Sequence, residues 1–226
     1  MLENHANKAN TETFARAGQA QRQCGNFCAA EHIVQQGLEL HPDSLHLAQE
    51  YALTARDKKD WPQALLRWRM IIEHFQDKAP ALAYSQLSKA CRQLSKLDFA
   101  ESTAEEGLSR YPDSMQLAMD YAEIAMSRRH WDTAVQRWQT ILEQFGVNAG
   151  PRVFIRLAVA YRNMLDPGRA ESIAENGLTA YPENMELLKI YSEIAMARRD
   201  WVQAVQRWQK VFDLFQVSVT HRLEYG

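Results

Sequence analysis

Apolar residues recur along most of the chain at the spacing of an α-helix. In residues 131–145, Trp131, Ala134, Trp138 and Ile141 follow one another at steps of three and four positions. Such residues lie on one face of a helix with 3.6 residues per turn. Residues 117–125 repeat the pattern. It predicts an all-α protein in which each helix buries one apolar face.

Proline and capping residues divide this pattern into short helices. Three prolines each end one helix, and a polar side chain two positions later can cap the next: Pro42 with Ser44, Pro112 with Ser114, and Pro182 with Asn184. Asp60 and Asp200 stand at the N-cap position before Trp61 and Trp201, while His130 breaks this pattern in between. The short connections predict antiparallel helix pairs.

The chain repeats itself with a period of 70 residues. Residues 100–146 and 170–216 are identical at 26 of 47 positions, and residues 30–76 and 100–146 at 19 of 47. All six tryptophans follow the period, as Trp61, Trp131 and Trp201 and as Trp68, Trp138 and Trp208. A fixed period of this kind is typical of a solenoid, in which each copy buries its apolar face against its neighbours.

Each copy divides into halves of about 34 residues, the period of the tetratricopeptide repeat. The sequence resembles that family in the small and large residues Leu157, Ala158, Tyr161, Ala170, Ala174 and Pro182, and in Trp131, Ala134, Trp138 and Ile141 of the other half. The first copy keeps a small residue at Gly18 but has Gln21 where Tyr161 stands. The resemblance implies an all-α solenoid, a right-handed superhelix of about six TPR-like helical hairpins. Its concave wall would consist of the first helix of each hairpin.

The resemblance also gives the expected domain boundaries. We expect a flexible N-terminus at residues 1–10 and one solenoid over residues 11–219. Its hairpin units cover about 11–43, 44–79, 80–113, 114–149, 150–183 and 184–219. Residues 221–226 align with 151–156 after a shift of 70 positions. Residues 220–226 are therefore expected to start a further, truncated unit.

Charged and amide residues recur at one place in the first helix of alternate hairpins, and they are the candidates for ligand binding. These are Arg22 with Gln23, Arg92 with Gln93, and Arg162 with Asn163, with Lys89 one turn before Arg92. A guanidinium beside a carboxamide can bind carboxylates and peptide amides. The resemblance implies the same use, because tetratricopeptide grooves often bind peptide segments or acidic chain ends. Alternatively, these are solvated residues that the helix dipole favours at a helix C-terminus.

The other hairpins offer a mixed, mildly apolar face in the same groove. Here the candidates are Glu123, Met126, Glu193 and Met196. Methionine can form an adaptable contact surface, but it equally fills gaps in a core. The tryptophans leave a similar choice between ligand stacking and packing between hairpins, and we expect packing. The small residues Gly37, Gly107 and Gly177 then allow helices to approach closely.

Charge and motifs exclude several functions. With 26 basic and 28 acidic side chains, the net charge of −2 gives no overall attraction for nucleic acid or an anionic membrane. The chain shows no signal peptide and no apolar stretch of about 18 residues, which predicts a cytoplasmic protein without membrane insertion. Cys24, Cys28 and Cys91 are too few for a disulfide framework, so we expect reduced, mostly buried thiols. Metal-ligand spacing, phosphate loops and nucleophile motifs are missing, and we expect neither a cofactor nor an enzyme.

Three functions fit these features. The first is a non-enzymatic scaffold that binds a peptide or protein segment, with or without acidic groups, in the concave groove. The second is the helical-repeat domain of a larger bacterial enzyme, because Trp-x-x-Ala-x-x-Arg-Trp is similar to repeats attached to polysaccharide-building glycosyltransferases and sulfotransferases. The third is a self-assembling module, since Val205, Trp208 and Phe212 would face an open end. That end would be covered by a second copy in a homo-oligomer, or it would continue in a longer protein.

Overall fold

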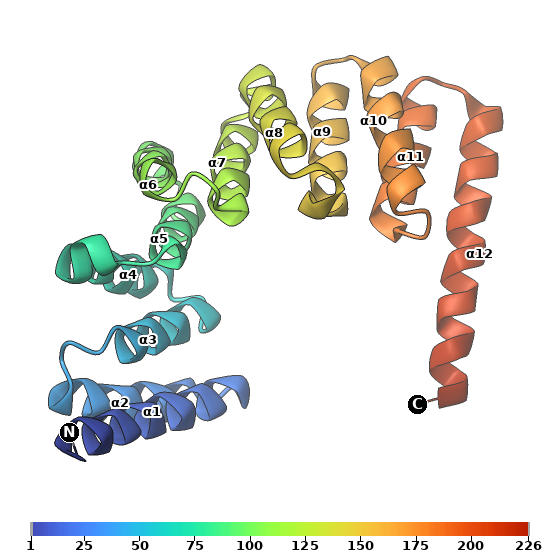
Figure 1. Ribbon diagram of the computed structural model, residues 1–226. Coiled ribbons are helices and arrows are strands. Elements are labelled where there is room, and N and C mark those ends of the chain that lie inside the picture. The colour runs from blue at the N-terminus through green and yellow to red at the C-terminus, as the bar shows by residue number, and fades with distance from the viewer. Residues whose placement is uncertain (1, 226) are drawn as a thin grey trace. The chain divides into compact units, whose positions relative to one another are not determined.

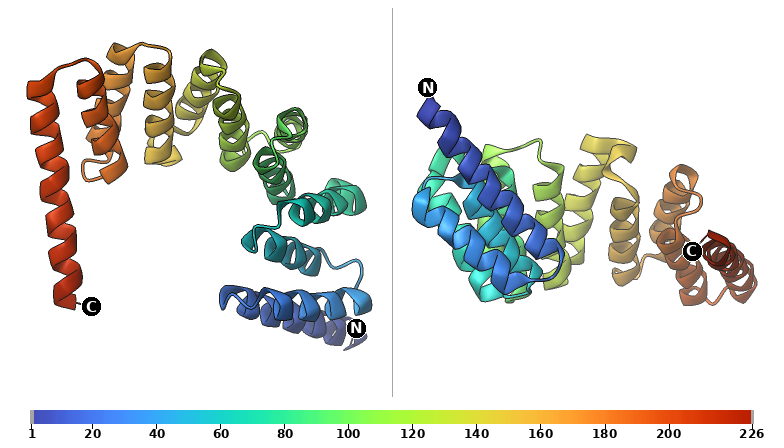
Figure 2. Two further views of the ribbon diagram at one scale, coloured as in Figure 1. Left: turned by 180° about the vertical axis from the view of Figure 1, so that it is seen from behind. Right: turned by 90° about the horizontal axis from the view of Figure 1, so that it is seen from below.

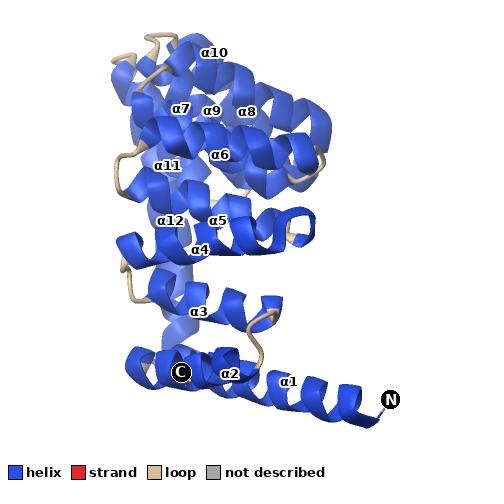
Figure 3. Cartoon of the chain, turned by 90° about the vertical axis from the view of Figure 1, so that its left-hand side faces the viewer, coloured by secondary structure: helices blue, strands red, loops and turns tan. Residues whose placement is uncertain are grey.

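Helices account for nearly all of the chain. The computed structural model describes the backbone of residues 2–225 and the side chains of residues 11–216, and none of these residues lies in a strand (Figure 3). The helices are α1 (Leu2–Gln23), α2 (Phe27–Leu40), α3 (Leu45–Asp57), α4 (Trp61–Phe75), α5 (Ala81–Gln93), α6 (Leu97–Arg110), α7 (Met115–Arg128), α8 (Trp131–Phe145), α9 (Pro151–Asn163), α10 (Pro167–Ala180), α11 (Met185–Ala197) and α12 (Trp201–Tyr225). Short 3-10 turns, Gln76–Lys78 and Gly146–Ala149, precede α5 and α9. The predicted all-α repeat fold is confirmed.

The chain forms two compact units, an N-terminal unit (Met1–Asp120) and a C-terminal unit (Tyr121–Gly226), with the boundary inside α7. Within the N-terminal unit, each of the helices α1 to α5 packs against the next one along the chain (Figure 1). The same holds for α8 to α11 in the C-terminal unit (Figure 2). First helices also contact one another directly, as α1 does with α3 and α9 with α11. Each unit is thus a stack of antiparallel hairpins.

The 70-residue period is visible in the helix boundaries. The helices α2, α6 and α10 begin at residues 27, 97 and 167, and α5 and α9 begin at residues 81 and 151. Only the two terminal helices depart from this register. Helix α1 begins at Leu2, inside the segment expected to be a flexible terminus, and α12 continues to Tyr225. Residues 220–225 therefore extend α12 and do not begin a new helix.

The predicted caps are formed. Ser44, Ser114 and Asn184 accept hydrogen bonds from the backbone N–H groups of Leu47, Leu117 and Leu187, respectively. Asp60 and Asp200 cap α4 and α12 in the same way, whereas His130 makes no side-chain cap. Each cap satisfies one of the N–H groups that a helix start leaves without an intrahelical partner.

The turns inside the hairpins depend on a left-handed backbone residue. In the turn that follows each first helix, one residue has φ between 58° and 79°: Gly25, Lys59, Ser95, Arg129, Leu165 and Arg199. Glycine adopts this conformation readily, but five of these six residues carry a side chain, at a cost of roughly 1 kcal/mol each. The sequence gives no signal for this turn, because the residues are of ordinary helix-forming or polar types.

The repeated glycines bring second helices close to first helices. A Cβ atom built on Gly107 would lie 2.7 Å from the Cβ of Tyr84 in α5, and one on Gly37 or Gly177 would lie 2.8 Å from Phe14 or Phe154. Real Cβ atoms essentially never approach so closely. The prediction that these glycines act as spacers is confirmed.

The tryptophans differ in burial along the chain. Trp68 in α4 and Trp138 in α8 are 0% exposed, which agrees with the expected packing role. Trp208, their counterpart in α12, is only partly buried. In the other series, Trp61 and Trp131 are partly buried and Trp201 is 59% exposed. The tryptophan side chains of the third copy are thus more exposed than their counterparts in the first two copies.

The arginine of the Trp-x-x-Ala-x-x-Arg-Trp pattern packs inside the fold. The guanidinium of Arg137 lies 3.4 Å from the centre of the Tyr121 ring and donates a hydrogen bond of 2.9 Å to the Tyr121 carbonyl. Arg67 with Tyr51 and Arg207 with Tyr191 repeat both contacts. A cation over an aromatic ring contributes about 0.5–2 kcal/mol. The pattern therefore has a structural explanation that requires no attached enzyme.

Candidate functional site

The predicted binding residues lie on what we call the first-helix surface. Each unit has its own first-helix surface: α1, α3, α5 and the start of α7 form it in the N-terminal unit, and the end of α7, α9 and α11 form it in the C-terminal unit. Ionised side chains of successive first helices meet here. Their pairing decides which of them remain available to a ligand.

Arg22, the first candidate, is buried inside an ion-pair network. Only 6% of the residue is exposed, and its guanidinium contacts the carboxylates of Glu50 at 3.1 Å and of Asp57, both from α3. Burial lowers the pKa of Arg22, but the hydrogen bonds and charges of Asp57 and Glu50 outweigh burial and raise the pKa above its ordinary value. Arg22 is thus charged and occupied, while its neighbour Gln23 is exposed.

Lys89 and Arg92 lie near a buried carboxylate, Asp120 of α7. Asp120 is 4% exposed and accepts hydrogen bonds from Ser85 Oγ at 2.5 Å and Gln116 Nε2 at 3.2 Å. Burial raises the pKa of Asp120, and the hydrogen bonds and the positive charges of Arg92 and Lys89 counteract that rise. The two cations are half-buried and balance this acid, whereas Gln93 is exposed.

The C-terminal unit holds a different arrangement, in which two arginines share one acid. Glu123 of α7 is 4% exposed, and its Oε1 accepts 2.7 Å hydrogen bonds from Arg152 Nη2 and from Arg156 Nε. The arginine side chains, which are one helical turn apart on α9, remain 46% and 36% exposed. Two positive charges therefore meet one negative charge, and we call Arg152 and Arg156 the twin arginines.

The remaining predicted residues lie beside the twin arginines or on the next helix. Arg162 of α9 pairs with the exposed Glu193 of α11, and Asn163 donates a 2.8 Å hydrogen bond to the carbonyl of Val159 in its own helix. Met126 is half-buried. Met196 is 44% exposed, and its sulfur accepts a 3.2 Å hydrogen bond from the indole of Trp208.

The twin arginines were not among the residues predicted from the sequence, although a signal for them exists. The 70-residue period aligns Arg152 with Glu12, Leu82 and Arg222, Arg156 with Arg16 and Gln86, and Glu123 with Leu53 and Glu193. Residues that hold the hairpins together recur in every copy, because every copy has to pack. Among residues 11–216, two arginines and one glutamate at these three aligned positions occur together only in α7 and α9, and a combination that the other copies lack is where binding residues should be sought.

Two expectations about chemistry can be compared with the structure. Cys24 and Cys28 are exposed, so the prediction of mostly buried thiols is wrong for two of the three cysteines. Both flank the turn between α1 and α2, whereas Cys91 is buried inside α5, and burial raises its pKa to about 11. Within residues 11–216, no group of three His, Cys, Asp or Glu side chains could hold a metal ion.

Among the helices of residues 2–225, none combines the length and the apolar character needed to cross a membrane.

The fold is similar to solved tetratricopeptide-repeat structures. No protein-family model matches the sequence, and no curated protein sequence matches it. The structure of pilF from Pseudomonas aeruginosa aligns with a TM-score of 0.72 and 14% identity, covering 93% of this chain and 94% of that one. A tetratricopeptide repeat protein from Parabacteroides merdae aligns with a TM-score of 0.69 and 17% identity, covering 95% and 82%.

A third similar structure is a complex. The APC/C hetero-tetramer Cut9–Hcn1 aligns with a TM-score of 0.69 and 14% identity over 90% of this chain, which spans 40% of the matched chain. At these identities the likeness concerns the fold alone. The chain has a TPR-like helical-repeat fold, and the all-α solenoid inferred from the sequence is confirmed.

Proposed function

We propose that this protein is a non-enzymatic scaffold that binds an acidic segment of a partner protein on the first-helix surface of its C-terminal unit. The observation that carries the proposal is the pair of twin arginines held by the single buried carboxylate of Glu123. The Cut9–Hcn1 complex supports the general role, because there a similar fold is part of a protein assembly.

The geometry favours a carboxylate as the bound group. Glu123 engages only Nη2 of Arg152 and Nε of Arg156. Among the described side chains no second acid pairs with either arginine, so each guanidinium keeps N–H groups directed elsewhere. Guanidinium groups bind carboxylates through paired hydrogen bonds. Because Glu123 already fixes both arginines, a ligand would not have to order them, which reduces the entropic cost of binding.

The other candidate cations are less suited to this role. Arg22 is buried against Glu50 and Asp57, and Lys89 and Arg92 balance Asp120. Separating a buried ion pair to bind a ligand leaves an uncompensated charge and costs about 3–5 kcal/mol. Arg162 is more accessible, since its pair with Glu193 is partly exposed and exposed pairs contribute at most about 1 kcal/mol. We therefore include Arg162 in the proposed site as an exchangeable contact.

The proposal is tested with a fluorescein-labelled hexaglutamate peptide, followed by fluorescence anisotropy, with hexaglutamine as the neutral control. We expect hexaglutamate to bind and hexaglutamine not to bind. Affinity should fall as salt is raised, because salt screens exposed charges. Simple removal of both arginines would leave Glu123 as a buried unpaired charge, so the test variant carries Glu123→Gln, Arg152→Gln and Arg156→Gln together.

Two matched variants control for indirect effects. Glu123→Gln alone removes the competing negative charge as well as the contact that orders the twin arginines, and hexaglutamate should still bind. Arg169→Gln removes an exposed arginine on α10 that pairs with Asp166, and binding should be unchanged. The triple variant should lose at least tenfold in affinity, with unchanged helical content by circular dichroism. Equal affinity of the triple variant and the unmodified protein would refute the site.

A further inference from the structure

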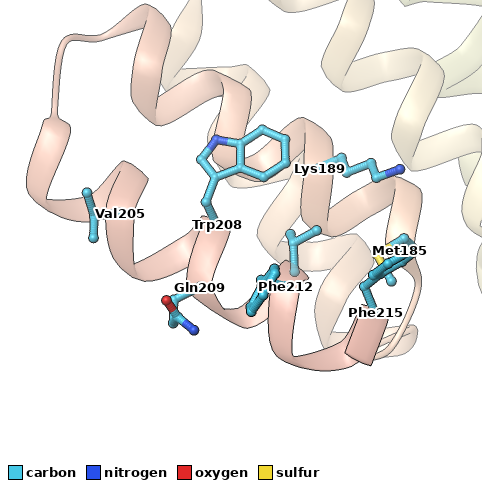
Figure 4. Close-up of a pocket in the computed structure, with 8 residues that line it drawn as sticks. Met185, Lys189, Val205, Trp208, Gln209, Phe212 and Phe215 are labelled. Carbon is cyan, nitrogen blue, oxygen red and sulfur yellow. The ribbon is translucent and has the colours of Figure 1, made fainter. Parts of the chain in front are cut away.

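The last helix exposes an apolar face. In α12, Val205 is 70% exposed and Phe212 is 53% exposed, and the partly buried Trp208 lies between them. Together with Met185 and Lys189 of α11 these residues line an open cavity of about 540 Å³ (Figure 4). Within the C-terminal unit, α12 has α11 on one side and no helix on the other (Figures 1 and 2). Exposed apolar surfaces of this kind are typical of interaction sites.

The chain itself shows what covers the equivalent face elsewhere. Seventy residues earlier, Val135 and Trp138 of α8 are 7% and 0% exposed, and α9 packs against that helix. In the N-terminal unit, α5 packs in the same way against α4, where Trp68 is 0% exposed. The same sequence pattern thus forms a helix–helix interface in both earlier copies.

The contacts of α5 identify which of its residues cover α4. Ser85 of α5 faces α7 through its hydrogen bond to Asp120, while Ser88 faces α6 through its 3.0 Å hydrogen bond to the carbonyl of Ala100. Helical geometry then turns Ala83, Leu87 and Ala90 toward the preceding hairpin. All three are buried.

Helix α9 repeats this face with Val153, Leu157 and Ala160, all buried. It adds Tyr161, whose hydroxyl accepts a 2.7 Å hydrogen bond from Gln139 Nε2 of α8. The covering helix is therefore defined by a small or branched residue, leucine four positions later, and alanine seven positions later. The residue eight positions after the first is cysteine in α5 and tyrosine in α9. Gln209 stands in α12 where Gln139 stands in α8.

We infer that the exposed face of α12 binds a helical hairpin of a partner protein whose first helix presents this pattern, as α9 does. The partner's leucine and small residues would cover Trp208 and Phe212. A tyrosine eight positions after the first residue of the pattern could accept a hydrogen bond from Gln209. Recognition of an amphipathic helix by an apolar groove is a common mode of protein binding. This site lies apart from the twin arginines, and the inference does not depend on the proposed function.

A second copy of this chain is a poorer occupant. Its helix equivalent to α5 and α9 is α1, which carries Thr13, Ala17 and Ala20 at the covering positions. Thr13 and Ala20 are exposed, and the ion pair of Glu12 with Arg16 lies on the same helix. Alanine replaces the leucine of the pattern, so a head-to-tail contact would cover the aromatic residues of α12 with a smaller and more polar surface.

The test uses a labelled peptide of residues 149–182, the α9–α10 hairpin of this chain, as the probe. We expect it to bind the full chain in an anisotropy titration, and we expect Leu157→Asp in the peptide to abolish binding. Phe212→Asp in the full chain should weaken binding at least tenfold. Leu165→Asp is the matched control, because Leu165 is an exposed apolar residue of the same unit that does not line the cavity, and it should leave affinity unchanged.

A grafted variant of the chain tests the same face without requiring an isolated peptide to fold. In this variant, residues 146–183 follow Phe215, so that the turn, α9 and α10 are placed after α12 as they are after α8. The graft should raise the thermal midpoint and abolish binding of an apolar dye. The inference is overturned if neither the peptide nor the graft occupies the face. It is also overturned if light scattering shows a dimer of the unmodified chain that Phe212→Asp dissociates, because the occupant is then a second copy.

Discussion

Replacing Trp138 by alanine should destabilise the protein far more than the equivalent replacement of Trp208. Trp138 is 0% exposed between α8 and its neighbours, whereas Trp208 is partly open to solvent. A buried tryptophan removes about 200 Å² of side-chain surface from water, or about 5 kcal/mol at about 25 cal/mol per Å². The methyl group of alanine retains part of this, which leaves about 3–5 kcal/mol, the usual cost of such a truncation. For Trp208, with less surface buried and no closed cavity created, we expect about 1–2 kcal/mol.

The assay is urea unfolding followed by circular dichroism at 222 nm. With a slope of about 2 kcal/mol per M, Trp138→Ala should lower the midpoint by about 2 M and Trp208→Ala by less than about 1 M. Trp138→Phe adds a second comparison. The indole N–H of Trp138 is buried without a hydrogen-bond partner, so phenylalanine should keep most of the packing and lose an unsatisfied donor. Equal midpoint shifts for Trp138→Ala and Trp208→Ala would refute the assignment of Trp138 to the core between hairpins.

Three further predictions follow from single residues. Gly107→Ala should cost about 1–3 kcal/mol in unfolding experiments, because its Cβ would lie 2.7 Å from Tyr84 Cβ; an unchanged midpoint would show that α5 and α6 can move apart freely. The pKa of Asp120 is raised in the folded state by burial, so its contribution to stability is present below the unfolded pKa of about 3.9 and is lost as pH rises through the folded value. Asparagine does not titrate, so the Asp120→Asn variant should become more stable relative to the unmodified protein as pH rises over this range. A difference between the two unfolding midpoints that stays constant with pH would contradict the direction of the pKa shift. Native protein at pH 8 should react with a thiol reagent at Cys24 and Cys28 but not at Cys91, which is buried and whose pKa is raised to about 11. Mass spectrometry identifies the labelled cysteines, and rapid labelling of Cys91 would contradict this prediction.

Most of the fold was predictable because its signals are local and repeated. The 3.6-residue pattern, the prolines with their caps at Ser44, Ser114 and Asn184, and the 70-residue period each act within one hairpin or between neighbours. The left-handed turn residues were not predicted, because their conformation depends on how the two helices of a hairpin are placed in the fold. Leu165 and Arg129 adopt the left-handed conformation without being glycine, and nothing in residue type distinguishes them from helix interiors.

The binding residues were harder to predict because ion pairing joins residues distant in sequence. Arg22 looked like a free ligand group, but its partners Glu50 and Asp57 are 28 and 35 positions later. The twin arginines lie 29 and 33 positions after Glu123. Whether an arginine is fully ion-paired or can still bind a ligand therefore depends on how the first helices pack. Comparison between the three copies recovers part of this information, since Arg67, Arg137 and Arg207 recur in all three copies with a packing role, whereas Glu12 and Leu82 stand in the first two copies where Arg152 stands in the third.

The arginines fall into two groups, those that hold hairpins together and those that remain available to a partner. The most direct test is an NMR titration of arginine-labelled protein with hexaglutamate, in which the side-chain Nε–H signals are followed. The Nε–H signals of Arg152 and Arg156 should shift on addition of the peptide, while those of Arg67, Arg137 and Arg207 stay in place. Shifts of the repeated arginines, with those of Arg152 and Arg156 unchanged, would contradict the account.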